Sequence, residues 1–149
     1  MSTDRIERTI VLRAPRSRVW RALARTEEFG AWFGVALEGK FAPGARLSGQ
    51  LTVPDFEYLT VEITVERVEP EQLLSYRWHP YAIEPDVDYA QEPTTLVEFH
   101  LAEVAGGTQL TVVESGFDRI PLARRATAFR MNDQGWVEQL TNIERHVAT

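Results

Sequence analysis

Glu114 is the side chain whose place in the sequence best suits it for chemistry. It follows Leu110 and Val112 at the two-residue spacing of a β-strand, so we expect its carboxyl group on the same buried face. A carboxyl group there would either anchor a ligand or pair with another buried polar group, and desolvation would raise its pKa. The alternatives are a hydrated position at the end of the strand and an ion pair with a nearby arginine.

Asp133 and Tyr76 are the candidates for a second group that would act with Glu114 in acid–base catalysis. Asp133 is the one polar residue in an apolar helical stripe. Its neighbours Asn132 and Gly135 favour a helix break at which one of these polar residues caps a second helical segment. The alternative is a continuous helix on which Asp133 points inward, where it would face Glu114 and form an acid–base pair.

The remaining reactive side chains form no recognisable catalytic or metal-binding motif. The chain has no cysteine, which excludes disulfides, thiolate metal sites and cysteine nucleophiles. His79, His100 and His146 are not spaced as metal ligands, and His100 falls on the exposed face of its strand. The serines lie outside any nucleophile elbow, and there is no glycine-rich phosphate loop. We therefore predict no metal and no cofactor, and we assign no catalytic residue.

Aromatic side chains supply most of the predicted ligand site. Tyr76 and Trp78 share a strand face with Leu74, and Trp136 lies on the apolar stripe of the last helix. Large aromatic residues usually fill a core, but their edges and polar tips can also line a cavity. Trp32 and Phe33, on a short helix, would guard one end of that cavity. The predicted ligand-binding residues are Trp32, Tyr76, Trp78, Phe99, Glu114, Phe129 and Trp136.

These side chains must be positioned by a sheet and a long helix. A first strand over residues 6–13 is followed by two short helices, and Phe29, Trp32 and Phe33 share one face of the second. Further strands are predicted over 46–53, 57–68, 73–78, 96–101 and 109–114. One side of the strand predicted over 46–53 would carry Leu47, Leu51 and Val53. Because short turns join the strands, the sheet should be antiparallel.

The last thirty or so residues form an amphipathic helix. Its predicted stripe consists of Leu122, Ala126, Phe129, Asp133, Trp136, Leu140, Ile143 and Val147. This helix alone is long enough to cover the apolar face of the sheet. It cannot fill a concave sheet to both ends, so we expect a pocket of about 300–1,000 Å³. The fold class is α+β, with a curved sheet of about six to seven strands around the helix.

Length and charge exclude several kinds of protein. A chain of 149 residues suits one domain spanning 1–149, and 16 basic against 22 acidic residues weigh against nucleic acid or anionic membranes as partners. No apolar run is long enough to cross a membrane and no signal peptide is recognisable, so we expect a cytoplasmic protein. The connection 80–93 exceeds a usual hairpin loop and is either a lid or a plain insertion. Its acidic residues lack the pattern of a calcium loop.

Short motifs along residues 6–147 resemble the START-like (SRPBCC) superfamily, and within it the family of homologues of the activator of the heat-shock-protein-ninety ATPase. The motifs are Ala14-Pro15 with Val19-Trp20, Trp32-Phe33, residues 65–70 leading to 74–78, residues 107–111 leading to Ser115-Gly116-Phe117, and Gly135-Trp136. The resemblance implies a helix-grip fold with a largely apolar cavity. Relatives include lipid and hormone carriers, aromatic polyketide cyclases and chaperone-binding domains, so the fold does not fix the activity.

Three hypotheses for the function follow. The favoured one is binding of a small hydrophobic, aromatic or lipid-like molecule between the sheet and the last helix, with Glu114, Tyr76 and Trp78 fixing its orientation. An interior filled solid by Trp78, Phe99, Phe129 and Trp136 would overturn this hypothesis. The second is a cyclase, hydrolase or isomerase that uses Glu114. The third is a chaperone-interacting module, which we disfavour because the chain is the bare domain. The sequence leaves open whether the chain forms a homodimer.

Overall fold

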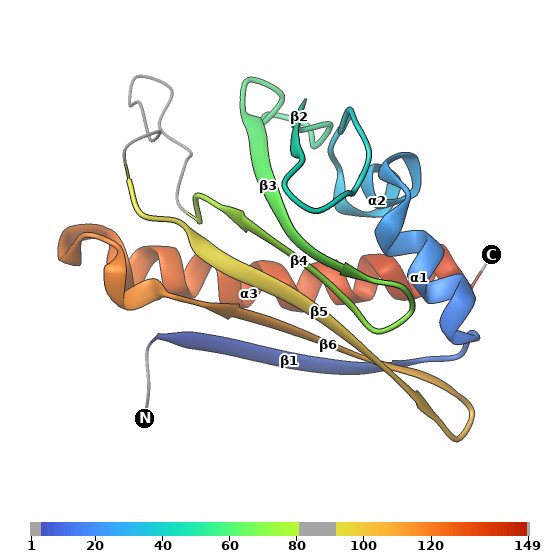
Figure 1. Cartoon of the computed structure of the whole chain (residues 1–149). Helices are drawn as coiled ribbons and strands as arrows, with labels where there is room; N and C mark the ends of the chain where they lie inside the picture. Colours follow the sequence, from blue (N-terminus) through green and yellow to red (C-terminus); the bar gives the residue numbers. More distant parts are fainter. Residues whose placement is uncertain (1–3, 81–91, 149) are drawn as a thin grey trace.

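A six-stranded antiparallel sheet is the framework of the chain in this computed structural model, which describes residues 4–80 and 92–148 (Figure 1). The strands lie in the order β1-β6-β5-β4-β3-β2. Their bounds are β1 Arg5–Leu12, β2 Arg46–Gln50, β3 Thr60–Glu69, β4 Leu73–Trp78, β5 Thr95–Val104 and β6 Gly107–Ser115. The helices are α1 Arg16–Ala24, α2 Thr26–Phe33, the 3-10 turn η1 Phe117–Arg119 and α3 Leu122–Val147. This is the α+β helix-grip arrangement that the sequence predicts.

Alternation of apolar and polar residues gives strand β3 one buried and one hydrated face. In β3, Ile63 and Val65 are buried whereas Glu62 and Thr64 are exposed. The prediction that Val53 continues such a pattern is wrong, since β2 ends at Gln50 and Val53 is 40% exposed. The reason is a turn that sequence periodicity does not reveal, in which the N–H of Phe56 donates to the carbonyl oxygen of Val53 at 3.0 Å.

Helix α3 runs across the sheet as one unbroken element (Figure 1). The second half of the predicted stripe is buried, with Trp136, Leu140, Ile143 and Val147 as its members. The first half differs, because Leu122 at the helix start is 78% exposed. A continuous helix leaves no second helical segment for Asp133 or its neighbours to cap, so the capping hypothesis is wrong.

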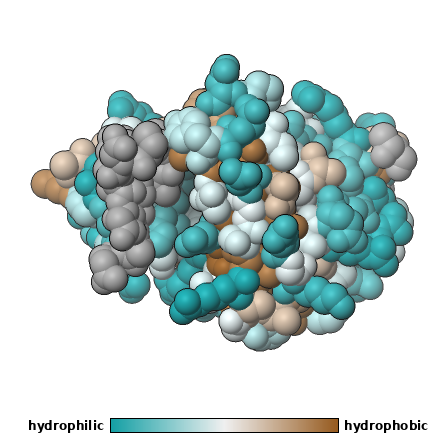
Figure 2. Space-filling view, turned by 90° about the horizontal axis from the view of Figure 1, so that it is seen from above, coloured by the Kyte–Doolittle hydropathy of each residue, from teal (hydrophilic) through white to brown (hydrophobic). Residues whose placement is uncertain are grey.

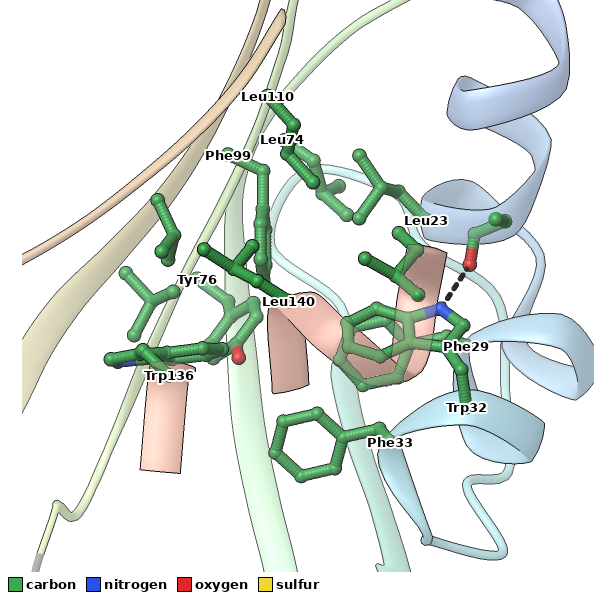
Figure 3. Packing of buried hydrophobic residues seen from close by; sticks show 14 of the residues in the cluster. Leu23, Phe29, Trp32, Phe33, Leu74, Tyr76, Phe99, Leu110, Trp136 and Leu140 are labelled. Atoms are coloured by element: carbon green, nitrogen blue, oxygen red, sulfur yellow. Dashed lines mark hydrogen bonds between the residues drawn. The ribbon is translucent and has the colours of Figure 1, made fainter. Parts of the chain in front are cut away.

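Helices α1 and α2 lie at the end of the sheet next to the C-terminal part of α3 (Figure 1). The indole N–H of Trp32 donates to the carbonyl oxygen of Ala22 at 2.8 Å and ties α2 to α1 (Figure 3). Glu28 of α2 contacts Arg18 of α1 at 2.7 Å and His146 of α3 at 2.9 Å. Burial by itself would raise the pKa of Glu28, but these hydrogen bonds and the nearby arginine charges lower it. The three helices are thus fixed to one another, which fixes the position of Phe33 at the end of α2.

No helix in the described part of the chain is long and apolar enough to cross a membrane. Residues 81–91 lie outside the described residues, so the lid and insertion alternatives for the connection 80–93 stay predictions.

Seen from above, apolar surface gathers at the middle of the molecule and hydrophilic side chains border it (Figure 2).

Candidate functional site

The carboxyl group of Glu114 is the polar centre of the interior. It is 0% exposed, and four side chains donate hydrogen bonds to it. The donors are Thr95 Oγ1 at 2.5 Å and Trp78 Nε1 at 2.8 Å to Oε2, Trp136 Nε1 at 2.8 Å to Oε1, and Asn132 Nδ2 at 3.0 Å to both oxygens. Of the alternatives that the sequence leaves open for Glu114, pairing with other buried polar groups is confirmed. The hydrated position and the arginine pair are wrong.

Strand register and helix periodicity bring these four donors together. Trp78 of β4 is paired with Thr95 of β5, and Glu114 of β6 is paired with Val97, two residues further along β5. Residues two apart on a strand share a face, so Thr95 lies diagonally beside Glu114. On α3, Asn132 and Trp136 are four residues apart and therefore share a face. Three strands and the helix thus meet at one carboxyl group.

The donor set around Glu114 suits an ionised carboxylate. Indole N–H and amide NH₂ groups can only donate, so Trp78, Trp136 and Asn132 all require an acceptor at this place. Burial raises the pKa of Glu114, and the hydrogen bonds from Thr95, the two tryptophans and Asn132 oppose part of that rise. Both oxygens are engaged and the side chain has no exposed surface. Glu114 therefore acts on its surroundings by holding two indole rings in place.

The raised pKa of Glu114 predicts a pH dependence of stability. In the unfolded chain the pKa of Glu114 is near 4.5, so the folded protein binds the proton of this carboxyl group more tightly than the unfolded chain does. The resulting contribution of Glu114 to the free energy of unfolding is fully present below pH 4.5 and is lost as pH rises through the folded-state pKa. The free energy of unfolding of the wild type, minus that of Glu114→Gln, should therefore fall as pH rises above about 4.5. Urea unfolding of both proteins measures it, and the opposite shift of Glu28 cancels in the difference. A difference that grows with pH would contradict the prediction.

A pocket of about 80 Å³, open to solvent, lies beside the two indoles. Its lining residues are Phe33, Trp78, Asn132, Gly135, Trp136 and Gln139. The Trp78 and Trp136 rings are stacked with centroids 5.8 Å apart, and the Phe33 ring lies 5.9 Å from Trp78 and 6.2 Å from Trp136. This pocket is smaller than the size predicted from the sequence, because aromatic rings occupy much of the space between the sheet and α3.

The predicted ligand-binding residues separate into three groups. Trp78 and Trp136 line the pocket, and Glu114 lies behind them. Tyr76, Phe99 and Trp32 are core residues that pack against the same cluster (Figure 3). The Tyr76 hydroxyl is buried with no hydrogen-bond partner among the described residues, and burial followed by the charge of Glu114 raises its pKa well above the usual value. Phe129 instead packs on Phe117 of η1, with ring centroids 5.2 Å apart.

The sequence interpretation missed several residues of this site. The sequence places Asn132 and Gly135 only at a helix break, and it does not single out Thr95 or Gln139. Phe33, which is predicted to guard one end of the cavity, does line the pocket. The alternation on β5 places Thr95 on the face of Val97 and Phe99, which is a signal that would have found it. Gln139 lies seven residues after Asn132, one of the spacings that keep residues on the same face of a helix.

Asp133 does not face Glu114. Its carboxylate accepts two hydrogen bonds of 2.9 Å from the guanidinium of Arg8 on β1, in a partly exposed ion pair. The hypothesis of an acid–base pair between Asp133 and Glu114 is therefore wrong. Asn132 faces Glu114 instead, since neighbouring residues on a helix point about 100° apart. His100 is exposed on the outer face of β5, as predicted.

The curved sheet, the long C-terminal helix and the interior between them define a protein of the START-like, helix-grip class. The chain belongs to the family described as "Activator of Hsp90 ATPase homolog 1-like protein", whose sequence profile matches residues 13–148. A comparison with curated proteins gave no match.

Solved structures share this fold over nearly the whole chain. A protein of the dynemicin biosynthetic locus, DynU16, is 26% identical over 98% of this chain with a TM-score of 0.74, and this chain spans 48% of that one. Protein BH1534 of Bacillus halodurans is 25% identical with a TM-score of 0.72, covering 96% of both chains. Protein MLL2253 of Mesorhizobium loti is 23% identical with a TM-score of 0.77, covering 97% of this chain and 96% of that one.

Proposed function

We propose that this chain binds a small, mostly apolar aromatic molecule in the pocket beside Trp78 and Trp136. The observation that carries the proposal is the pair of stacked indoles at the pocket wall, both held by one buried carboxylate. Ring faces fixed in advance lose little freedom when a ligand binds, which favours affinity. Burial of apolar ligand surface against them contributes roughly 25 cal/mol per Å².

The size of the pocket limits how a ligand enters. A cavity of ~150 Å³ is known to enclose one benzene molecule, and a cavity needs only ~10–15 Å³ to hold a water. A pocket of about 80 Å³ lies between these values. Because it is open to solvent, it suits one aromatic ring inserted by its edge, with the remainder of the ligand outside.

The same contacts give less support to an enzyme that uses Glu114 as acid or base. A general base must reach the proton that it abstracts, directly or through one water. The carboxylate oxygens are occupied by four donors, and Glu114 is not among the lining residues of the pocket. We therefore assign Glu114 a positioning role in binding.

Titration of ¹⁵N-labelled protein with lipid, aromatic and steroid probes, 2-naphthol among them, tests the proposal. We expect saturable shifts of the indole N–H signals of Trp78 and Trp136, since both rings line the pocket. The indole signals of Trp20 and Trp32 serve as internal references, because neither residue is a lining residue. Truncation of the side chain in Phe33→Ala should weaken binding of 2-naphthol by about 5- to 50-fold, because the pocket loses one of its aromatic lining residues. If no aromatic probe shifts the Trp78 and Trp136 signals, the proposal is wrong.

A further inference from the structure

Gly135 occupies a distinctive place in the wall of the pocket. It lies within the 26-residue helix α3, and the lining residues Asn132 and Gln139 stand three residues before and four residues after it. Residues at these spacings lie on one face of a helix. The pocket is therefore formed where this face of α3 lacks a side chain, between two amide side chains.

A β-carbon at this position would not collide with the protein. A Cβ atom built on Gly135 meets no other atom within 4 Å, apart from the helix's own nearby backbone. Glycine inside a helix is unfavourable compared with alanine, because it loses more backbone freedom on folding. Neither backbone conformation nor crowding thus accounts for a glycine here, whereas an open pocket does.

The polar atoms around Gly135 indicate what the pocket would recognise. Gln139 is engaged at both ends, since its Nε2 donates to the carbonyl oxygen of Phe33 at 2.9 Å and its Oε1 accepts from Asn142 at 3.1 Å. The Trp78 and Trp136 N–H groups and the Asn132 NH₂ group all donate to Glu114. Asn132 Oδ1 remains as a hydrogen-bond acceptor in the pocket wall, since no described residue donates a hydrogen bond to it.

We infer that Gly135 is a specificity-determining residue that admits a flat, uncharged aromatic ring carrying a hydrogen-bond donor, either a phenolic O–H or a ring N–H. The inference rests on the proposed function and names the ligand class for that site. The ring lies over the bare backbone of Gly135, and its donor meets Asn132 Oδ1. An anionic ligand is disfavoured, because Asn132 offers an acceptor and the Glu114 carboxylate lies directly behind it.

Variants of Gly135 distinguish an effect on ligand binding from an effect on the stability of helix α3. Gly135→Ala should raise Tm by about 1–4 °C while weakening 2-naphthol binding by about 3- to 10-fold. Gly135→Leu should fill the pocket and weaken binding by at least about 30-fold. Gln134→Leu is the matched control, because it adds the same side chain at the exposed neighbouring position on α3 and should leave affinity within about 2-fold. Thermal unfolding and calorimetric titration give the two readouts.

A pair of probes tests the hydrogen-bond donor without disturbing Glu114. Wild-type protein should bind 2-naphthol about 3- to 10-fold more tightly than 2-methoxynaphthalene, which has no donor. If the wild type binds 2-naphthol while Gly135→Leu binds it equally well, or if both probes bind alike, the inference is overturned and the proposed function stands. A wild type that binds neither probe, nor any other aromatic compound, overturns both.

Discussion

Replacing Glu114 with glutamine should lower the free energy of unfolding by about 2–4 kcal/mol. Two indole N–H groups and one amide converge on this side chain and can only donate, so both of its end groups must accept. Glutamine offers one accepting oxygen and turns an NH₂ group toward the other donors. Buried donors are then left without partners, which costs about 1–3 kcal/mol for each such group.

Chemical denaturation measures this loss, and the indole signals show where it arises. The N–H resonances of Trp78 and Trp136 should move strongly in Glu114→Gln, whereas that of Trp32, which donates to Ala22, should stay in place. Glu62→Gln is the matched control, because Glu62 is an exposed carboxylate on β3 and its replacement should change stability by less than about 0.5 kcal/mol. Equal stability of the Glu114→Gln and Glu62→Gln proteins would show that the buried network contributes nothing.

Replacing Gly30 with alanine should destabilise the protein by about 1–3 kcal/mol and disturb the pocket. A Cβ atom on Gly30 would lie 2.2 Å from the carbonyl oxygen of Val35, and that oxygen belongs to backbone that cannot rotate away. The chain folds back onto α2 here, with the N–H of Val35 bonded to the carbonyl oxygen of Gly30 at 3.1 Å. Relief of the clash must move the end of α2, which carries Phe33.

The matched control for this prediction is the same substitution at the other helical glycine. Gly135→Ala should stabilise the protein by about 0.5–1 kcal/mol, because it improves helix propensity where space is free. The same substitution would then change the free energy of unfolding in opposite directions at the two helical glycines, and only their surroundings would account for the difference. Unfolding curves of the two variants decide this, and a Gly30→Ala protein at least as stable as the wild type would contradict the clash.

The strand face of the candidate site could be predicted from the sequence. Side chains alternate with period two along a strand, so Leu110, Val112 and Glu114 had to share a face, as did Tyr76 and Trp78. The turn signals between the strands likewise gave an antiparallel sheet, because such short connections cannot cross over. These features depend only on neighbours in the sequence.

The helix face of the site could not be predicted in the same way. Neighbouring positions on a helix differ by about 100°, so a small rotation of α3 decides whether Asn132 or Asp133 meets Glu114. That rotation is set by the packing of Trp136 and Leu140 against the sheet and by the ion pair of Asp133 with Arg8. Both are contacts between residues far apart in the sequence.

The sequence by itself determined the order of the elements, the buried face of each strand and the acidic, cysteine-free composition that limits the chemistry, because these follow from local periodicity and residue type. Only the tertiary structure decided that Glu114 would be enclosed by four donors and that the pocket would be small. Those outcomes depend on strand register, on the rotation of α3 and on how aromatic rings from α2, β4 and α3 fill the common space. Local sequence carries no information on how much of that space the rings leave open.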